Sequence, residues 1–331
     1  MTELTRRTVL TSAAAIGATA MTTLDATPAS AAASAASTQA PGFYRYKVGD
    51  YEITVVTDGS NTRPLAEGYV TNQKLEDVQA ALAAAFMDKD KVTIRYSPIV
   101  VNTGSKLIVI DTGQGEANLQ QSKGSSGQFQ TNLKAAGIDR NAVDMVVISH
   151  FHSDHINGLL TPDNKAAFGK AEILVPAPEW KYFMDDGEMS RASAGRMQDV
   201  FKNTRRVFDA LGRKVTPYEM GKEVAPGITA VATHGHSAGH TSHIIASGSG
   251  KVFVQADVTN LPQLFVRNPG WHASFDQDPK MAEDVRRKTY DMLAAEKMMV
   301  QGFHYPFPAV AHIEKTGTGY REIPIAWNSS L

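Results

Sequence analysis

Three histidines and an aspartate, residue types that bind metal ions, lie within six residues of one another at His150, His152, Asp154 and His155. They follow the apolar run 145–148, which is typical of a buried β-strand. Where a strand ends in a turn, side chains leave strict alternation and can converge on one point. Imidazole nitrogens and carboxylate oxygens bind zinc and similar ions. The pattern predicts a metal site; the alternative is a polar surface turn, but turns favour Gly, Asn or Pro over His.

Three later positions have the same character. His240 follows a glycine-bearing turn, Asp257 ends an apolar strand, and His304 follows another apolar run near the C-terminus. Each of them alone is more often a structural residue than a metal ligand, but together with the first cluster they predict a larger site. A non-enzymatic zinc-binding protein is the alternative, and such a protein usually carries a low-complexity histidine tract. These ligand-type residues stand instead at separate strand ends.

Composition narrows the function further. The chain has 331 residues, no cysteine and a formal net charge of −1. The absence of cysteine excludes disulfides, thiolate ligands and a cysteine nucleophile, so any metal must be held by nitrogen and oxygen. A charge near zero argues against binding to nucleic acid through a basic surface.

Strands and helices alternate through both halves of the chain without a linker-like break, which predicts one α/β domain of sheets covered by helices. Asp111 ends one strand, where it either orients a metal ligand or forms an ordinary turn. Residues 115–127 are polar and predict a mobile loop. The apolar patterns predict strands over 51–59, 96–101, 106–110, 145–148, 172–176, 228–233, 242–246 and 251–255, and helices over 75–86, 132–137, 197–211 and 278–297.

The first forty residues have the composition of an export signal. Arg6 and Arg7 precede an apolar, alanine-rich stretch over 13–21, and small residues at 29–31 suit cleavage. That stretch is shorter than the roughly 18 apolar residues of a membrane-spanning helix. Residues 1–40 are therefore predicted to form a twin-arginine signal and a flexible tether, and residues 41–331 the mature domain of a periplasmic or secreted protein.

The order HxHxDH, a histidine in a GH turn, an aspartate that closes a strand and a late histidine resembles the metallo-β-lactamase superfamily. Segments 41–45, 101–107, 132–137 and 304–308 are similar to its methyl parathion hydrolase branch, which also holds lactone-cleaving relatives. This resemblance implies an αββα sandwich with two metal ions, most often Zn²⁺, at one edge of the sheets. By position, it implies three sets of ligands: His150, His152 and His240 for the first ion, Asp154, His155 and His304 for the second, and Asp257 between the two.

Such a pair of ions suits hydrolysis. Two cations about 3.5 to 4 Å apart lower the pKa of a shared water and polarise a carbonyl or phosphoryl oxygen. Asp154 could steer the resulting hydroxide or receive a proton, so Asp154 and Asp257 are the candidate catalytic residues.

The expected substrate is a small apolar ester or lactone, such as an acyl-homoserine lactone, because aromatic walls would bury its surface. Five aromatic residues are candidates for these walls, and packing in the hydrophobic core is their alternative role. An organophosphate triester is the alternative substrate, although 111–130 and 257–275 depart from the parathion hydrolase pattern; a β-lactam is a weaker alternative. No nucleic acid is expected as a partner, no membrane after signal removal, and a homodimer is left open. The candidate wall residues are Phe151, Trp180, Phe183, Phe265 and Trp271.

The export prediction can be tested on the paired arginines. Replacing both Arg6 and Arg7 with Lys is expected to retain the precursor in the cytoplasm, because the twin-arginine pathway reads this pair. Cell fractionation and immunoblotting measure the distribution of precursor and mature protein. Periplasmic accumulation equal to that of the unaltered chain would rule out this route.

Overall fold

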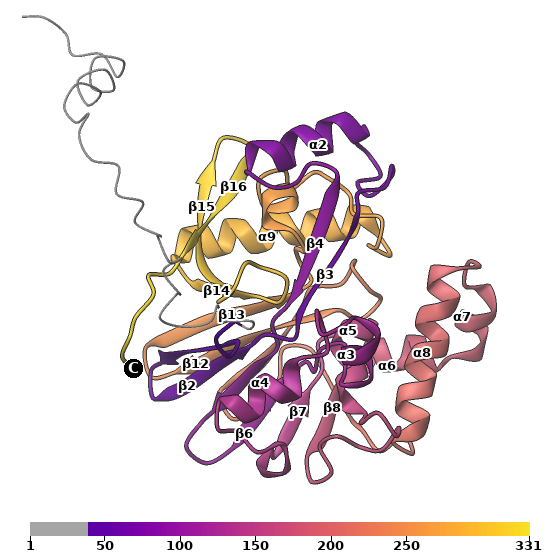
Figure 1. The fold of residues 1–331 in the computed structure, drawn as a ribbon, viewed down its shortest axis with the longest axis vertical. Coiled ribbons are helices and arrows are strands. Elements are labelled where there is room, and N and C mark those ends of the chain that lie inside the picture. Colours follow the sequence, from indigo (N-terminus) through magenta and orange to yellow (C-terminus); the bar gives the residue numbers. More distant parts are fainter. Residues whose placement is uncertain (1–38) are drawn as a thin grey trace, which may run out of the picture. The chain divides into compact units, whose positions relative to one another are not determined.

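The described part of the computed structural model, residues 39–331, contains two seven-stranded mixed sheets packed face to face (Figure 1). The predicted signal and nearly all of its tether lie outside these residues. None of the helices described is long and apolar enough to cross a membrane. In spatial order, the first sheet holds β1 (Phe43–Val48), β2 (Tyr51–Val56), β5 (Ile99–Asn102), β6 (Leu107–Ile110), β7 (Met145–Val147), β8 (Glu172–Pro176) and β9 (Thr216–Tyr218).

The second sheet contains most of the C-terminal half of the chain. Strands β13 and β14 run parallel and all its other neighbouring strands are antiparallel, whereas in the first sheet β6, β7, β8 and β9 run parallel. The spatial order is β10 (Glu223–Ala225), β11 (Ile228–Ala232), β12 (Thr241–Ser247), β13 (Gly250–Ala256), β14 (Met299–Gly302), β15 (Val310–Thr316) and β16 (Gly319–Pro324).

The central core lies between the two sheets. Ile53 and Ile108 from the first sheet and Ile245 and Val252 from the second are each 0% exposed and belong to one apolar cluster. The interdigitation of these branched side chains holds the sheets together.

Helices cover the outer faces (Figure 1). On the first sheet the buried rings of Phe129, Phe183 and Phe201 pack against the outward side chains of the strands, and on the second sheet Tyr290 and Leu293 of α9 do so. The layers are therefore helix, sheet, sheet, helix, and the predicted α/β sandwich is confirmed. The helices are α2 (Leu75–Ala84), α3 (Ala117–Gln121), α4 (Phe129–Ala135), α5 (Ser153–Ile156), α6 (Ala177–Met184), α7 (Asp186–Arg191), α8 (Arg196–Ala210) and α9 (Pro279–Glu296).

The two long helices, α8 and α9, show the features from which the sequence predicts them. The Asp278 side chain accepts a hydrogen bond from the Met281 N–H at 2.9 Å, and Pro279 occupies the first helical position of α9. In α8 the buried residues Phe201, Thr204, Val207 and Phe208 recur at helical spacing.

The structure corrects three of the predicted elements. The strand predicted over 96–101 is broken at Pro98, whose ring nitrogen has no N–H for a ladder, so β4 (Lys91–Tyr96) ends before it and β5 begins after it. The strand predicted over 51–59 ends at Val56, and a new strand, β3 (Gly59–Pro64), pairs with β4 as a separate two-stranded sheet. The predicted loop over 115–127 contains α3.

Candidate metal centre

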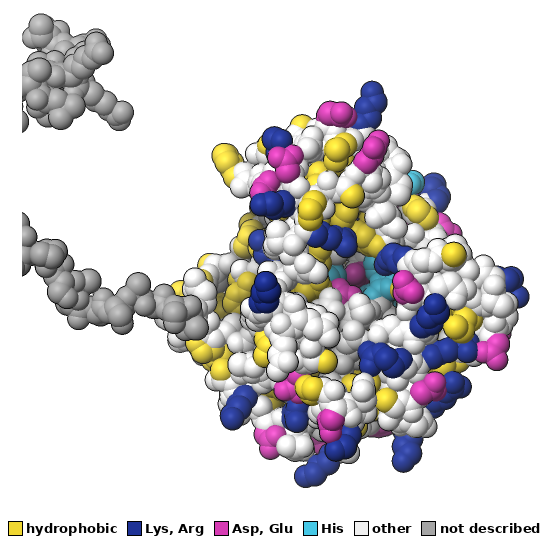
Figure 2. Space-filling model, turned by 45° about the vertical axis from the view of Figure 1, so that its right-hand side comes forward, with side chains coloured by type: hydrophobic (Ala, Val, Ile, Leu, Met, Phe, Trp, Pro, Cys, Tyr) yellow, Lys and Arg dark blue, Asp and Glu magenta, His cyan; other side chains and the backbone are white. Residues whose placement is uncertain are grey.

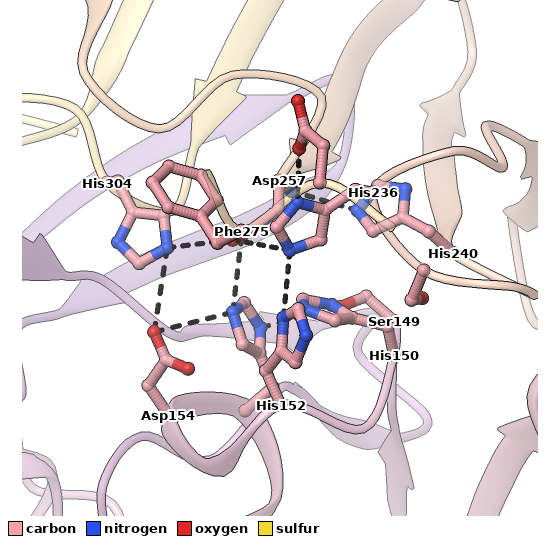
Figure 3. Close-up of polar contacts among 12 residues, drawn as sticks. Ser149, His150, His152, Asp154, His236, His240, Asp257, Phe275 and His304 are labelled. Atoms are coloured by element: carbon pink, nitrogen blue, oxygen red, sulfur yellow. Dashed lines mark hydrogen bonds and ion pairs between the residues drawn. The ribbon is translucent and has the colours of Figure 1, made fainter. Parts of the chain in front are cut away.

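The first ligand-type side chains come from the loop that follows β7. His150 and His152 lie in that loop, and Asp154 and His155 lie in the short helix α5 that begins directly after it (Figure 3). Extended backbone at His152, with φ −67° and ψ 154°, precedes the helical turn. This change of backbone conformation brings side chains that are close in sequence to one point, as the sequence predicted.

The remaining side chains come from three strand ends in the second sheet. His236 lies in the turn after β11, Asp257 follows β13 directly, and His304 lies two residues beyond β14. Because β13 and β14 are parallel, their C-terminal ends share one edge of the sheet. In the turn, Gly235 has φ +125° and a side chain there would meet the Ala282 nitrogen at 2.4 Å, so only glycine suits this close approach to α9.

The first group consists of His150, His152, His236 and Asp257. The Nε2 atoms of His150 and His236 lie 2.9 and 2.8 Å from the Nδ1 atom of His152 (Figure 3). The Oδ2 atom of Asp257 lies 3.3 Å from Nε2 of His236. All four ligand atoms fall within 4.8 Å of one another.

The second group consists of Asp154, His155 and His304, and Asp257 contacts it as well. The Oδ2 atom of Asp154 lies 3.8 Å from Nε2 of His155 and 3.6 Å from Nε2 of His304. Asp257 reaches His155 through Oδ1 at 3.2 Å and His304 through Oδ2 at 3.0 Å. The Asp257 carboxylate therefore lies between the two groups, where one carboxylate could serve two cations.

These residues fit a pair of divalent transition metals. Nε2 of His155 and Oδ1 of Asp257 are buried and have no hydrogen-bond partner in the described structure, and both face the shared space. A neutral imidazole has only one N–H, so three rings directed at one another cannot satisfy all their inward nitrogens by hydrogen bonds alone. A cation in each group would satisfy them, and the nitrogen and oxygen donors are ligands that Zn²⁺ accepts.

Burial sets the charge of two histidines in the first group. Desolvation lowers the pKa of His150 and His152 well below the usual value, so both rings are neutral, which is the form that binds a metal. For His155, desolvation also lowers the pKa, but the carboxylates of Asp257 and Asp111 outweigh it and raise the pKa well above the usual value. A cation near these carboxylates would supply the positive charge in its place.

The outer nitrogens of several rings are held by partners that fix their orientation. Nδ1 of His155 donates to Oδ2 of Asp111 at 2.8 Å, and the Ser149 N–H and hydroxyl also donate to this carboxylate. Nδ1 of His304 donates to the Arg95 carbonyl at 2.6 Å. Such partners leave Nε2 free to face a metal. Of the two roles left open for Asp111, these hydrogen bonds favour the one in which it orients a ligand-type side chain, here His155.

His236 is held in the same way by a buried ion pair. Its Nδ1 atom donates to Oδ1 of Asp276 at 2.9 Å, and Nη2 of Arg286 donates to Oδ2 of that carboxylate at 3.3 Å. Arg286 is 2% exposed and also donates to three backbone carbonyls, those of Val258, Pro269 and Trp271. The α9 helix therefore positions His236.

The structure places His236, rather than His240, in the first group, which corrects the ligand assigned by position. His240 is 0% exposed, and both of its ring nitrogens are occupied by the protein: Nδ1 donates to the Thr233 carbonyl at 2.9 Å and Nε2 accepts the Asp257 N–H at 2.9 Å. His240 thus supports Asp257 through its backbone. The two histidines share one turn and each follows a glycine, so the local sequence does not show which one approaches the site.

A second residue that sequence reasoning missed is Glu179 in α6. Its side chain is 0% exposed and accepts three hydrogen bonds: from the Phe151 N–H at 3.1 Å, from the Ser237 hydroxyl at 2.9 Å and from the Gly239 N–H at 2.6 Å. Burial raises the pKa of Glu179, and these donors oppose that rise. Glu179 thus ties the loop of His150 to the turn of His236.

The groups lie at the floor of a cavity of about 650 Å³. Figure 2 shows histidine and acidic side chains deep in a hollow of the surface, with Lys and Arg side chains around it. The site residues that line the cavity are His152, Asp154, His236, Asp257 and His304.

None of the five aromatics predicted to line the substrate site borders this cavity, which is a correction. Their burial in apolar clusters accounts for it, because core packing and a pocket wall call for the same residue types. Phe151, Phe183 and Trp180 pack in the cluster outside the first sheet, and Phe265 and Trp271 pack beside β4 and α2.

The family model of the metallo-beta-lactamase superfamily matches residues 96–287. The chain belongs to this superfamily. The resemblance seen in the sequence and the αββα sandwich that it implied are both confirmed. Among curated proteins no relative matches the chain.

Solved structures show the same superfamily fold. AidC, a dizinc quorum-quenching lactonase solved with a product, is 23% identical with a TM-score of 0.80, over 87% of this chain and 99% of that one. The hydrolase AbOPH is 24% identical with a TM-score of 0.80, over 88% and 100%. A probable metal-dependent hydrolase from Staphylococcus aureus is 20% identical with a TM-score of 0.66, over 86% and 100%. At these identities the likeness shows the fold, while the activities belong to those proteins.

Removal of the Glu179 carboxylate should loosen the centre. The Glu179→Ala variant leaves three buried donors unpaired, so we expect a loss of roughly 3 kcal/mol in the free energy of unfolding. Urea denaturation followed by circular dichroism measures the loss, and Glu296→Ala, at an exposed position of α9, is the control. A Glu179→Ala variant as stable as this control would contradict the role of Glu179 as a tie between the two loops.

Proposed function

We propose that this superfamily hydrolase cleaves a small ester or lactone with the help of two divalent metal ions. The observation that carries the proposal is the position of Asp257 between two ligand groups, at the floor of a cavity that substrate can enter. Support also comes from AidC, which is a dizinc lactonase of the same fold.

The chemistry divides between the metals and the chain. When bound, a pair of divalent cations would polarise the carbonyl oxygen of the scissile ester and lower the pKa of a water. Asp154 belongs to the second group, its side chain keeps 18% of its surface exposed, and it lines the cavity. Its free oxygen can therefore orient a water or hold a proton beside the scissile bond. Amide side chains in the lining, Asn61, Gln114 and Asn260, can donate hydrogen bonds to the substrate.

A screen of the zinc-loaded protein tests this function. We expect hydrolysis of aryl esters or lactones, loss of that activity after chelation, and its return when zinc is added. An organophosphate triester and a β-lactam, included in the same screen, test the two alternative substrate classes. Preferential cleavage of either would replace the ester or lactone assignment, and full activity without bound metal would end the metal-dependent proposal.

The Asp257→Asn variant tests the shared carboxylate. Asn has nearly the volume of Asp but no charge to offset the repulsion between two nearby cations, so at least one metal should be lost. We expect a fall in kcat of about a hundredfold, on the order of 2.7 kcal/mol, because two-metal activation is lost. Elemental analysis and steady-state kinetics are the measurements, with circular dichroism to check folding.

The control for this variant is Asp209→Asn, an exposed residue of α8 that pairs with Arg213. It makes the same chemical change outside the cavity. Wild-type metal content together with wild-type kcat in Asp257→Asn would refute the bridging role.

A further inference from the structure

Two arginines line the cavity above the metal centre. Arg63 lies on β3 and Arg196 begins α8, so they come from elements far apart in the sequence. Figure 2 shows basic side chains beside the hollow whose floor holds the histidines. None of the ion pairs among residues 39–331 includes either arginine. The two guanidinium groups thus face the substrate space without a carboxylate partner.

The present contacts of these arginines are with an aromatic ring, a backbone carbonyl and a histidine. The guanidinium of Arg63 lies 5.8 Å from the ring centroid of Tyr69, and Arg196 donates to the Phe275 carbonyl at 3.1 Å. Nη2 of Arg196 lies 3.3 Å from Nε2 of His152. Nδ1 of His152 faces the first group, so a metal bound there places the ring proton on Nε2, which then cannot accept a hydrogen bond. With the metal bound, Nη2 of Arg196 is therefore available to a ligand.

The other charges of the lining favour an anion. Asp154 and Asp257 belong to the ligand groups, where bound cations would neutralise them. Asp199 is the remaining carboxylate of the lining, and it is exposed and forms no ion pair with Arg196 within 4.0 Å. Both arginines are exposed residues, and a guanidinium stays charged at neutral pH. A negative ligand group would relieve the repulsion between the two arginines.

The rest of the lining does not suit a long apolar substrate. Sites for apolar ligands are lined mainly by hydrophobic and aromatic side chains. This cavity has only four such residues besides its histidines, whereas its other residues are polar or charged. The four are Ile94, Tyr96, Val200 and Phe275.

We propose that Arg63 and Arg196 bind a carboxylate group of the substrate, which makes the natural substrate an anionic ester or lactone. This inference rests on the proposed function, since the scissile carbonyl must lie at the metal centre while the carboxylate lies at the arginines. A guanidinium presents paired N–H donors that match the two oxygens of a carboxylate.

A matched pair of substrates tests the proposal. The mono-p-nitrophenyl ester of glutaric acid and p-nitrophenyl butyrate share a leaving group but differ by one carboxylate. With the zinc-loaded protein we expect a kcat/KM at least about tenfold higher for the charged ester. Raising the salt concentration should reduce that ratio. Equal values for the two esters would overturn the proposal.

Variants of the two arginines test whether the preference for the charged ester arises at their guanidinium groups. Arg63→Gln and Arg196→Gln should each lower the ratio of kcat/KM for the charged ester to kcat/KM for the neutral ester about tenfold, mainly by raising KM for the charged ester. Arg213→Gln, an exposed residue just beyond α8, is the matched control and should change neither. Equal losses for both esters would indicate a structural role and reject the proposal. Metal content and circular dichroism are measured for each variant.

A binding measurement separates this inference from the hydrolase proposal. Calorimetry with the zinc-loaded protein compares glutarate and butyrate, each of which offers one carboxylate to the metals, whereas only glutarate has a second for the arginines. We expect tighter binding of glutarate, reduced to the butyrate level in the arginine variants. That result supports the anion site even if neither ester is cleaved, in which case the hydrolase proposal alone fails. Cleavage of both esters with no glutarate preference would reject the anion site alone.

Discussion

The carboxylate of Asp257 is the interaction on which the centre depends, because its two oxygens lie within 3.3 Å of ligand-type nitrogens in both groups. Its place is set by the backbone. The preceding residue, Ala256, has a φ of +48°, and the pairing of β13 with β14 shifts register there, so the chain leaves the sheet at this point. The imidazole of His240 then accepts the Asp257 N–H. A histidine that faces neither group thus fixes the residue that the two groups share.

The sequence predicted the parts of the site whose geometry is local. His150 to His155 converge because one strand end and one helical turn follow each other directly, and the apolar run before them marks the strand. The choice between His236 and His240 is not local, since it depends on the approach of Gly235 to α9 and on the hydrogen bond to Asp257. The prediction that five aromatics line the substrate site was wrong for a related reason: burial in a core and burial against a substrate favour the same residue types.

The fold, too, could be predicted from the sequence only in part. The apolar patterns predicted most strands and the long helices, but Pro98 divides the strand predicted over 96–101 between two different sheets. The ribbon of β3 and β4 that results carries Arg63 to the cavity. Asp58, just before β3, is 0% exposed and accepts the N–H groups of Gln114 and Phe129, and burial raises its pKa to about 7. This aspartate thus anchors both ends of the segment that was predicted to be a mobile loop.

The polarity of the cavity changes what the fold alone would suggest about the substrate. An apolar acyl chain gains from leaving water only where hydrophobic side chains receive it, and here the five aromatics predicted to form the wall pack in apolar clusters instead. Polar side chains remain around the metal centre, with two arginines that form no ion pair among residues 39–331. Under the proposed function, bound metals would fix where a bond is broken and the charged lining would select the molecules that reach them, because cations at the floor and guanidinium groups in the wall both attract negative charge.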